Sequence, residues 1–152
     1  MYRLVCAIFV LSRALRAAGA CDLIPQAQIF PMLGSTKNKA IDSLKPPLPP
    51  KATSGKACSY AGTDNSATVI WYTFANPAAA RDYLKTVREG FEDQNLRTTS
   101  EKFGAEEGFS FSNGMLAVKK NVWIRVNVNS TAGTIVSPDL TRQLLLIALK
   151  AN

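Results

Sequence analysis

Hydrophobic and polar residues alternate along the chain with two periods, one typical of strands and one of helices. Residues 122–129 alternate strictly, and their aliphatic positions are Val122, Ile124, Val126 and Val128. This period of two predicts a strand with one buried face. Residues 67–74 (ATVIWYTF) are β-branched or aromatic on both faces, which predicts a central strand covered on both sides. Shorter strands are predicted at 58–61, 108–112 and 115–119, with turns at 62–65, 112–114 and 119–121.

Three segments carry the signals of helices. Asn76-Pro77 is a strong helix start, and an apolar stripe follows it to about Gln94 at Ala80, Tyr83, Leu84, Val87 and Phe91. Ser137-Pro138 starts a terminal helix whose apolar positions are Leu140, Leu144, Ile147, Ala148 and Ala151. A short first helix is predicted within residues 22–34. Pro31 should kink that helix or end it at Phe30, because proline removes an intrahelical hydrogen bond.

The resulting order, α-β-β-α-β-β-β-α, predicts an α+β fold. We expect an antiparallel sheet of about five strands packed by two or three helices. Residues 35–56 have no period and are rich in proline and lysine, so they are expected to form a stiff surface loop, to which we assign no function. A chain of 152 residues has room for one ordinary domain, which we place at residues 21–152.

The first twenty residues differ from the rest and predict a signal peptide. Arg3 precedes an apolar run at 4–11, and small residues fill positions 17–20. The run is too short for a permanent membrane anchor, so no transmembrane helix is expected after cleavage. This predicts an extracytoplasmic location, either periplasmic or secreted. Arg13 and Arg16 also fit an alternative, the amphipathic N-terminal helix of a cytosolic protein.

The cysteines support export but leave two fates open for Cys21. Once Cys6 is assigned to the leader, Cys21 and Cys58 remain as an even pair, which suggests a disulfide in an exported domain. Residues 18–21 (AGAC) also partly resemble a lipobox, in which Cys21 would be lipidated and anchor the protein to a membrane. The two fates exclude each other because both consume the same thiol.

Several weak motifs together resemble one known family. They are Cys21-Asp22-Leu23-Ile24 before a helix that ends at Leu33-Gly34, Cys58-Ser59-Tyr60 opening a strand, and residues 104–109 before a hairpin built like residues 115–128. This pattern is similar to that of small exported, often lipid-anchored bacterial proteins of unknown function, best represented in actinobacterial cell envelopes. The resemblance covers nearly all of residues 21–129. It implies a Cys21–Cys58 bridge and an α+β sandwich, and it brings no catalytic residues with it.

The composition argues against most catalytic chemistry. The chain contains no histidine, which removes the commonest general base and the usual zinc ligand. No metal site, cofactor or catalytic residue is therefore predicted, and the protein is expected not to be an enzyme. The alternative is a carboxylate-based hydrolase of envelope glycans, for which the available acids are Asp64, Glu92, Glu106 and Glu107.

The charge distribution gives no case for nucleic-acid binding. The whole chain carries +7, but Arg3, Arg13 and Arg16 belong to the leader, and without them 15 basic and 11 acidic side chains leave +4. Five lysines (Lys37, Lys39, Lys45, Lys51 and Lys56) are scattered through the predicted loop, as in a solvated surface segment.

The outward face of the last strand is the one candidate binding surface. Trp123, Arg125 and Asn127 share this face, and Trp and Arg are enriched at binding hot spots. The alternative is that Trp123 packs against cross-strand neighbours or a helix and that Arg125 covers it. We therefore expect a non-catalytic envelope domain that binds a partner protein, a lipid or a cell-wall component. An inhibitor or immunity protein is a further possibility.

Overall fold

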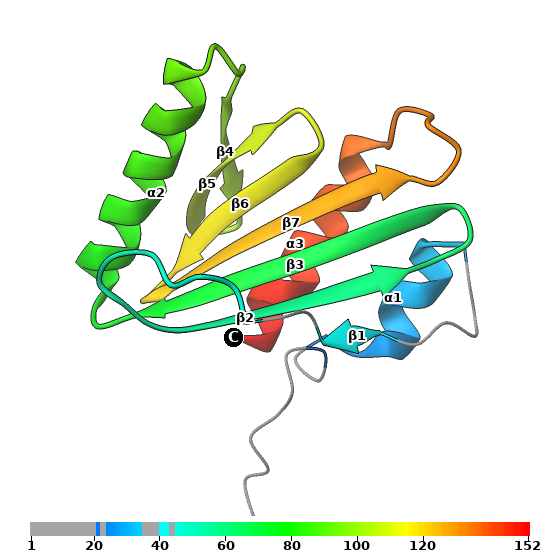
Figure 1. Cartoon of the computed structure of the whole chain (residues 1–152), viewed down its shortest axis with the longest axis horizontal. Coiled ribbons are helices and arrows are strands. Elements are labelled where there is room, and N and C mark those ends of the chain that lie inside the picture. Colours follow the sequence, from blue (N-terminus) through cyan, green and yellow to red (C-terminus); the bar gives the residue numbers. More distant parts are fainter. Residues whose placement is uncertain (1–20, 22–23, 35–39, 43–44) are drawn as a thin grey trace, which may run out of the picture.

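The computed structural model in Figure 1 describes residue 21 and residues 24–34, 40–42 and 45–152. The fold is α+β, as predicted, with one antiparallel sheet and three helices. The elements are α1 (Gln26–Met32), β1 (Ile41–Asp42), β2 (Ala52–Ala61), β3 (Asn65–Phe74), α2 (Pro77–Asp93), β4 (Thr99–Phe103), β5 (Glu106–Phe111), β6 (Gly114–Lys119), β7 (Val122–Ser130) and α3 (Pro138–Ala151). The predicted signal peptide lies outside the described residues.

The sheet has more strands than the sequence predicted. Its seven strands follow the spatial order β1-β2-β3-β7-β6-β5-β4, and all neighbours are antiparallel. The two missed strands, β1 and β4, form its two edges. The expected loop at 35–56 is also wrong in part, because Ala52–Lys56 begins β2 and Ile41–Asp42 forms β1. Strand β1 has only two residues, and in β4 only Phe103 is buried, so neither edge strand carries a clear hydrophobic pattern.

The two faces of the sheet carry different helices (Figure 1). One face packs against α1 and α3 around an aliphatic core that includes Val69, Ile124 and Val126. The opposite face packs against α2 around aromatic residues such as Tyr72 and Trp123. Strand β3 contributes to both clusters, so the prediction of a central strand covered on both sides is confirmed.

Helices α2 and α3 begin where their capping residues predicted. The side chain of Asn76 accepts a hydrogen bond from the backbone N–H of Ala79 at 2.9 Å, and Ser137 accepts one from Asp139 at 3.3 Å. The apolar stripe expected on α3 differs from the buried face observed, and the two share only Leu144 and Ala148. The buried residues of α3 are Thr141, Leu144, Leu145, Ala148 and Leu149, because the leucine-rich sequence leaves the choice of face to tertiary packing.

The first helix is short and joined covalently to the sheet. Helix α1 spans Gln26–Met32 with Pro31 inside it, so it continues beyond the expected end at Phe30. Cys21, just before this helix, forms a disulfide with Cys58 of β2, with Cα atoms 5.2 Å apart. The bridge links Cys21 covalently to the sheet. It also leaves no thiol at Cys21 for the alternative, a lipid.

Candidate functional site

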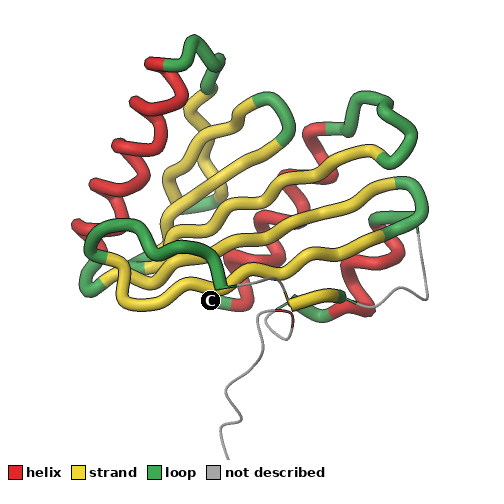
Figure 2. Tube along the Cα trace, viewed as in Figure 1, coloured by secondary structure: helices red, strands yellow, loops and turns green. Residues whose placement is uncertain are grey.

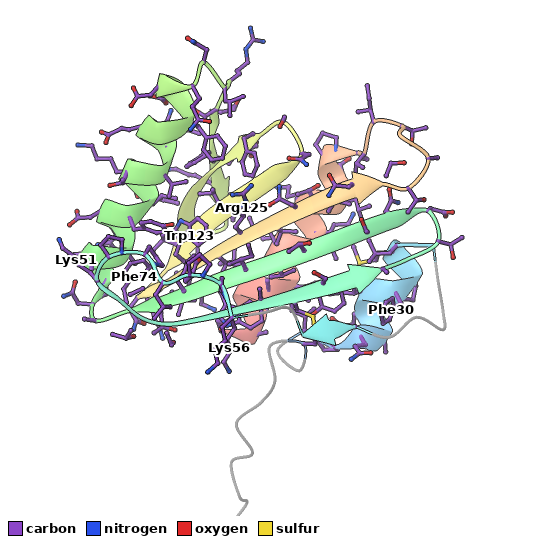
Figure 3. All side chains as sticks on the ribbon, in the orientation of Figure 1. Phe30, Lys51, Lys56, Phe74, Trp123 and Arg125 are labelled. Atoms are coloured by element: carbon purple, nitrogen blue, oxygen red, sulfur yellow. A yellow bond between two sulfur atoms is a disulfide. The ribbon has the colours of Figure 1, made fainter. Side chains whose placement is uncertain are left out.

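The three candidate residues of the predicted binding face project from β7 on the α2 face of the sheet, and Figure 3 labels two of them. Trp123 is only 3% exposed. Its ring centroid lies 5.5 Å from that of its cross-strand neighbour Tyr72 and 5.3 Å from that of Tyr83 on α2. Trp123 therefore packs inside the α2 cluster, and its indole N–H has no partner among the described residues.

Arg125 lies at the border of that cluster and is half-buried. Its guanidinium carbon is 4.8 Å from the ring centroid of Phe111 and 5.8 Å from that of Phe91, so two aromatic faces hold it. Its Nε donates to Oδ1 of Asn127 at 2.6 Å. Burial lowers the pKa of Arg125, although nearby Tyr83 and Tyr72 oppose this shift. Arginine nevertheless remains charged at any physiological pH.

No carboxylate neutralises Arg125 in the part of the chain that the structure describes. The ion pairs found there join Lys85 to Glu89, Arg88 to Glu92 and Arg142 to Glu101. A charged side chain that is partly removed from water is normally paired. Arg125 thus has a stacked guanidinium with Nη groups that donate to no described acceptor. This arrangement suits an anionic group supplied from outside.

A row of amide side chains continues from Arg125 along the sheet. Asn127 accepts from Arg125 and donates to Asn113 at 3.2 Å, and Asn113 donates to Asn129 at 2.8 Å. Beyond α2, strands β2, β3 and β7 continue toward the β2–β3 turn without a described helix over this face (Figure 1). Most residues of these strands that face this side are small and polar. We call this part of the sheet the open face and define it by Ser59, Thr68, Ile70, Arg125, Asn127 and Asn129.

The carboxylates considered for hydrolysis do not gather at one place. Asp64 is exposed in the β2–β3 turn, and Glu92 on α2 accepts hydrogen bonds from Arg88 and Thr98. Glu106 and Glu107 are neighbours in β5, so their side chains point to opposite faces of the sheet. None of the three hollows found among the described residues is lined by two of these four acids.

Two of those hollows have a volume of about 490 Å³ each. The first, here named the α3 hollow, lies between the start of α3, residues 131–136 and the ends of β5, β6 and β7. The second lies between α2 and the β4–β5 hairpin and is lined by the cations Arg81, Lys85, Arg88 and Lys102. Sequence reasoning missed both hollows, because segments far apart in the chain form their walls.

No protein-family model matches the chain, and comparison with curated proteins gives no match. None of the described helices is long and apolar enough to cross a membrane. The Cys21–Cys58 disulfide agrees with an extracytoplasmic location, because such bonds persist mainly in oxidising compartments.

Proposed function

We propose that this protein is an exported, non-catalytic binding domain of the cell envelope. Its partner is a protein that places a carboxylate against Arg125 on the open face. The supporting observation is the half-buried guanidinium of Arg125, which stacks on Phe111 and has no acidic partner among the described residues. A carboxylate can accept two parallel hydrogen bonds from such a group.

The shape of the open face favours a macromolecule over a small ligand. Arg125 and Asn127 line none of the described hollows, whereas small-molecule sites are usually concave. Arginine is enriched at protein interfaces, and the polar side chains around Arg125 suit the polar rim of such an interface. The disulfide supports the exported context, and an inhibitor or immunity protein is one form that this function could take.

The proposal separates the roles of the two neighbouring residues of β7. Arg125 contacts the partner, whereas Trp123 stays buried and positions the strand beneath α2. The variant Arg125→Met should fold normally, because the methionine side chain is similar in length to that of arginine and packs well against aromatic rings.

Photo-crosslinking in the producing cells tests this function. A benzophenone amino acid at Thr68, on the open face beside Asn127, should give an adduct with an envelope protein. Arg125→Met should abolish that adduct. Arg81→Met is the matched control, since it removes an exposed arginine on α2 and gives the same net charge. An adduct that survives Arg125→Met, or no adduct from Thr68, contradicts the proposal.

A further inference from the structure

The α3 hollow lies at the end of the sheet where α3 begins, and several hydrogen bonds hold its walls. Arg125 does not line it, although Phe111 and Asn129, at the border of the open face, do. Part of its wall comes from Thr134, Ile135 and Val136 in the loop that leads into α3. This loop is one of the green segments of Figure 2. Within this loop, Ser130 Oγ accepts from the backbone N–H groups of Ala132 and Thr134 and contacts the Thr134 hydroxyl at 2.8 Å. Thr131 donates its hydroxyl to the carbonyls of Thr63 and Asp64. The wall is thus tied to the β2–β3 turn.

The charge of the α3 hollow is already balanced by the protein. Glu101 is the one ionisable residue among those that line it. Its carboxylate accepts from Arg142 at 2.6 Å and from the hydroxyl of Ser110 at 3.2 Å. A free anion would be repelled by this carboxylate, and a free cation would have to displace Arg142. The electrostatics therefore favour a neutral ligand.

Thr141 gives the hollow an unused hydrogen-bonding group. This residue of α3 is 5% exposed and lines the hollow. Its hydroxyl takes part in none of the hydrogen bonds found between described side chains, and it is not among their fully buried polar atoms without a partner, so it faces the open space of the hollow. A hydroxyl group that faces a hollow can hydrogen-bond to water or to a polar group of a ligand. A ligand hydroxyl in the hollow can therefore bond to Thr141 in place of water.

The remaining residues that line the hollow include both polar and apolar side chains. Hydroxyl and amide side chains come from Thr99, Ser112, Asn113, Asn129 and Thr134, and apolar ones from Phe111, Met115, Val128, Ile135 and Val136. Ile135 is 98% exposed at this rim, so its side chain is free to contact a ligand. A sugar ring has the matching surface, since it presents hydroxyl groups at its edge and C–H groups on its faces.

We propose that the α3 hollow binds a neutral saccharide of one or two rings. Thr141 hydrogen-bonds a sugar hydroxyl, and Ile135 covers an apolar ring face. The volume of about 490 Å³ is within the range of small-molecule sites. Asn129 belongs to both sites, but Thr141 and Ile135 lie outside the open face and Arg125 lies outside the hollow, so variants of these residues test the two proposals separately.

Saturation-transfer NMR and calorimetry with glucose, N-acetylglucosamine, arabinose and maltose test this site. We expect at least one of these sugars to bind to the wild-type protein. Thr141→Val keeps the side-chain shape and removes only the hydroxyl, so it should weaken binding about 3- to 10-fold, as for the loss of one neutral hydrogen bond. Ile135→Ser should also weaken binding. Thr68→Val, the same change on the open face, should leave the affinity unchanged.

Thermal melting shows whether the variants used in the binding experiment are as stable as the wild type. Thr141→Val should not lower Tm, because it replaces a hydroxyl that faces the hollow with a methyl group. If this variant does not fold, Ile135→Ser on the exposed loop carries the test. The proposal is overturned if none of the four sugars binds, or if affinity is equal in the wild type and in the folded hollow variants.

Discussion

The two faces of the sheet are covered by helices that are buried to very different extents. On the α1/α3 face, Leu144 and Leu145 of α3 are completely buried. On the other face, the buried residues of α2 are the small Ala79 and Ala80. The larger residues of its apolar stripe are only half-buried, and these are Tyr83, Leu84, Val87 and Phe91. Helix α3 is thus part of the main core, whereas α2 lies at the border of a smaller aromatic cluster.

This difference in burial shows which side chains are accessible to a partner. Fully buried aliphatic contacts stabilise the fold, but they leave no side chain available for a partner. The partly exposed aromatic cluster leaves Phe91 and Phe111 able to hold a cation at the surface. Regions with fewer buried contacts also open at lower free energy. We therefore expect amide protons of α2 to exchange faster than those of α3.

The largest expected effect comes from removing the covalent link on the α1/α3 face. Cys58 is completely buried, and the bridge to Cys21 closes a loop across 37 positions. The double variant Cys21→Ala/Cys58→Ala should lose about 3 to 4 kcal/mol of unfolding free energy, according to the chain-entropy relation. Urea denaturation measures this loss, and reduced wild-type protein serves as the control. A loss of unfolding free energy below about 1 kcal/mol would mean that the disulfide contributes little to holding α1 in place.

The same leucine deletion on each helix tests the comparison directly. Leu144→Ala on α3 should destabilise by about 3 kcal/mol, because the site is fully buried and a cavity remains. Leu84→Ala on α2 should cost only about 1 kcal/mol, because solvent already reaches that side chain. Thermal or urea denaturation of both variants provides the measurement. Equal losses would show that the two faces are equally integral to the core.

The elements that the sequence predicted well carry strong local signals. Asn76-Pro77 and Ser137-Pro138 define helix starts by capping chemistry alone, and the alternation in 122–129 identifies β7 with one residue missed at its end. Strand β4 (Thr99–Phe103) lacks such a signal. In this strand only Phe103 is buried, and its existence depends on pairing with β5, which no local pattern encodes.

The candidate site could be predicted only in part, for a related reason. The alternation predicted that Trp123 and Arg125 share one face of the sheet, and this is confirmed. Whether that face is open or covered depends on where α2 crosses it, and this is a tertiary property. Trp123 lies under the helix and Arg125 at its border. Two residues apart in sequence, they therefore differ in their access to a partner.

Arg125→Met should change stability little while abolishing the proposed binding. The substitution loses two cation–π contacts of about 0.5 to 1 kcal/mol each at exposed sites and the hydrogen bond from Nε to Asn127. It gains apolar packing and removes the cost of a partly buried charge. We expect a net change within about 1 kcal/mol in urea denaturation. A loss above about 2 kcal/mol would instead identify Arg125 as a structural residue of the α2 cluster.

The smallest expected effect concerns acid loosening of the C-terminal end of α2. Hydrogen bonds from Arg88 and Thr98 lower the pKa of Glu92 below its ordinary value of 4.5. The folded state thus favours the carboxylate, and its contribution is present above pH 4.5 and lost as the pH falls through the lowered pKa. An NMR titration of the Glu92 carboxyl carbon measures this, and Arg88→Gln should move the midpoint up toward the ordinary value.

Acid should therefore affect the two faces differently. Because the Glu92 contacts hold the end of α2 beside the start of β4, amide exchange in α2 should rise as Glu92 is protonated, while α3 stays protected by its buried leucines. Glu92→Gln should already show the faster exchange at neutral pH. Equal acceleration in both helices would mean that acid acts on the whole sheet, and an unchanged midpoint in Arg88→Gln would remove Glu92 as the cause.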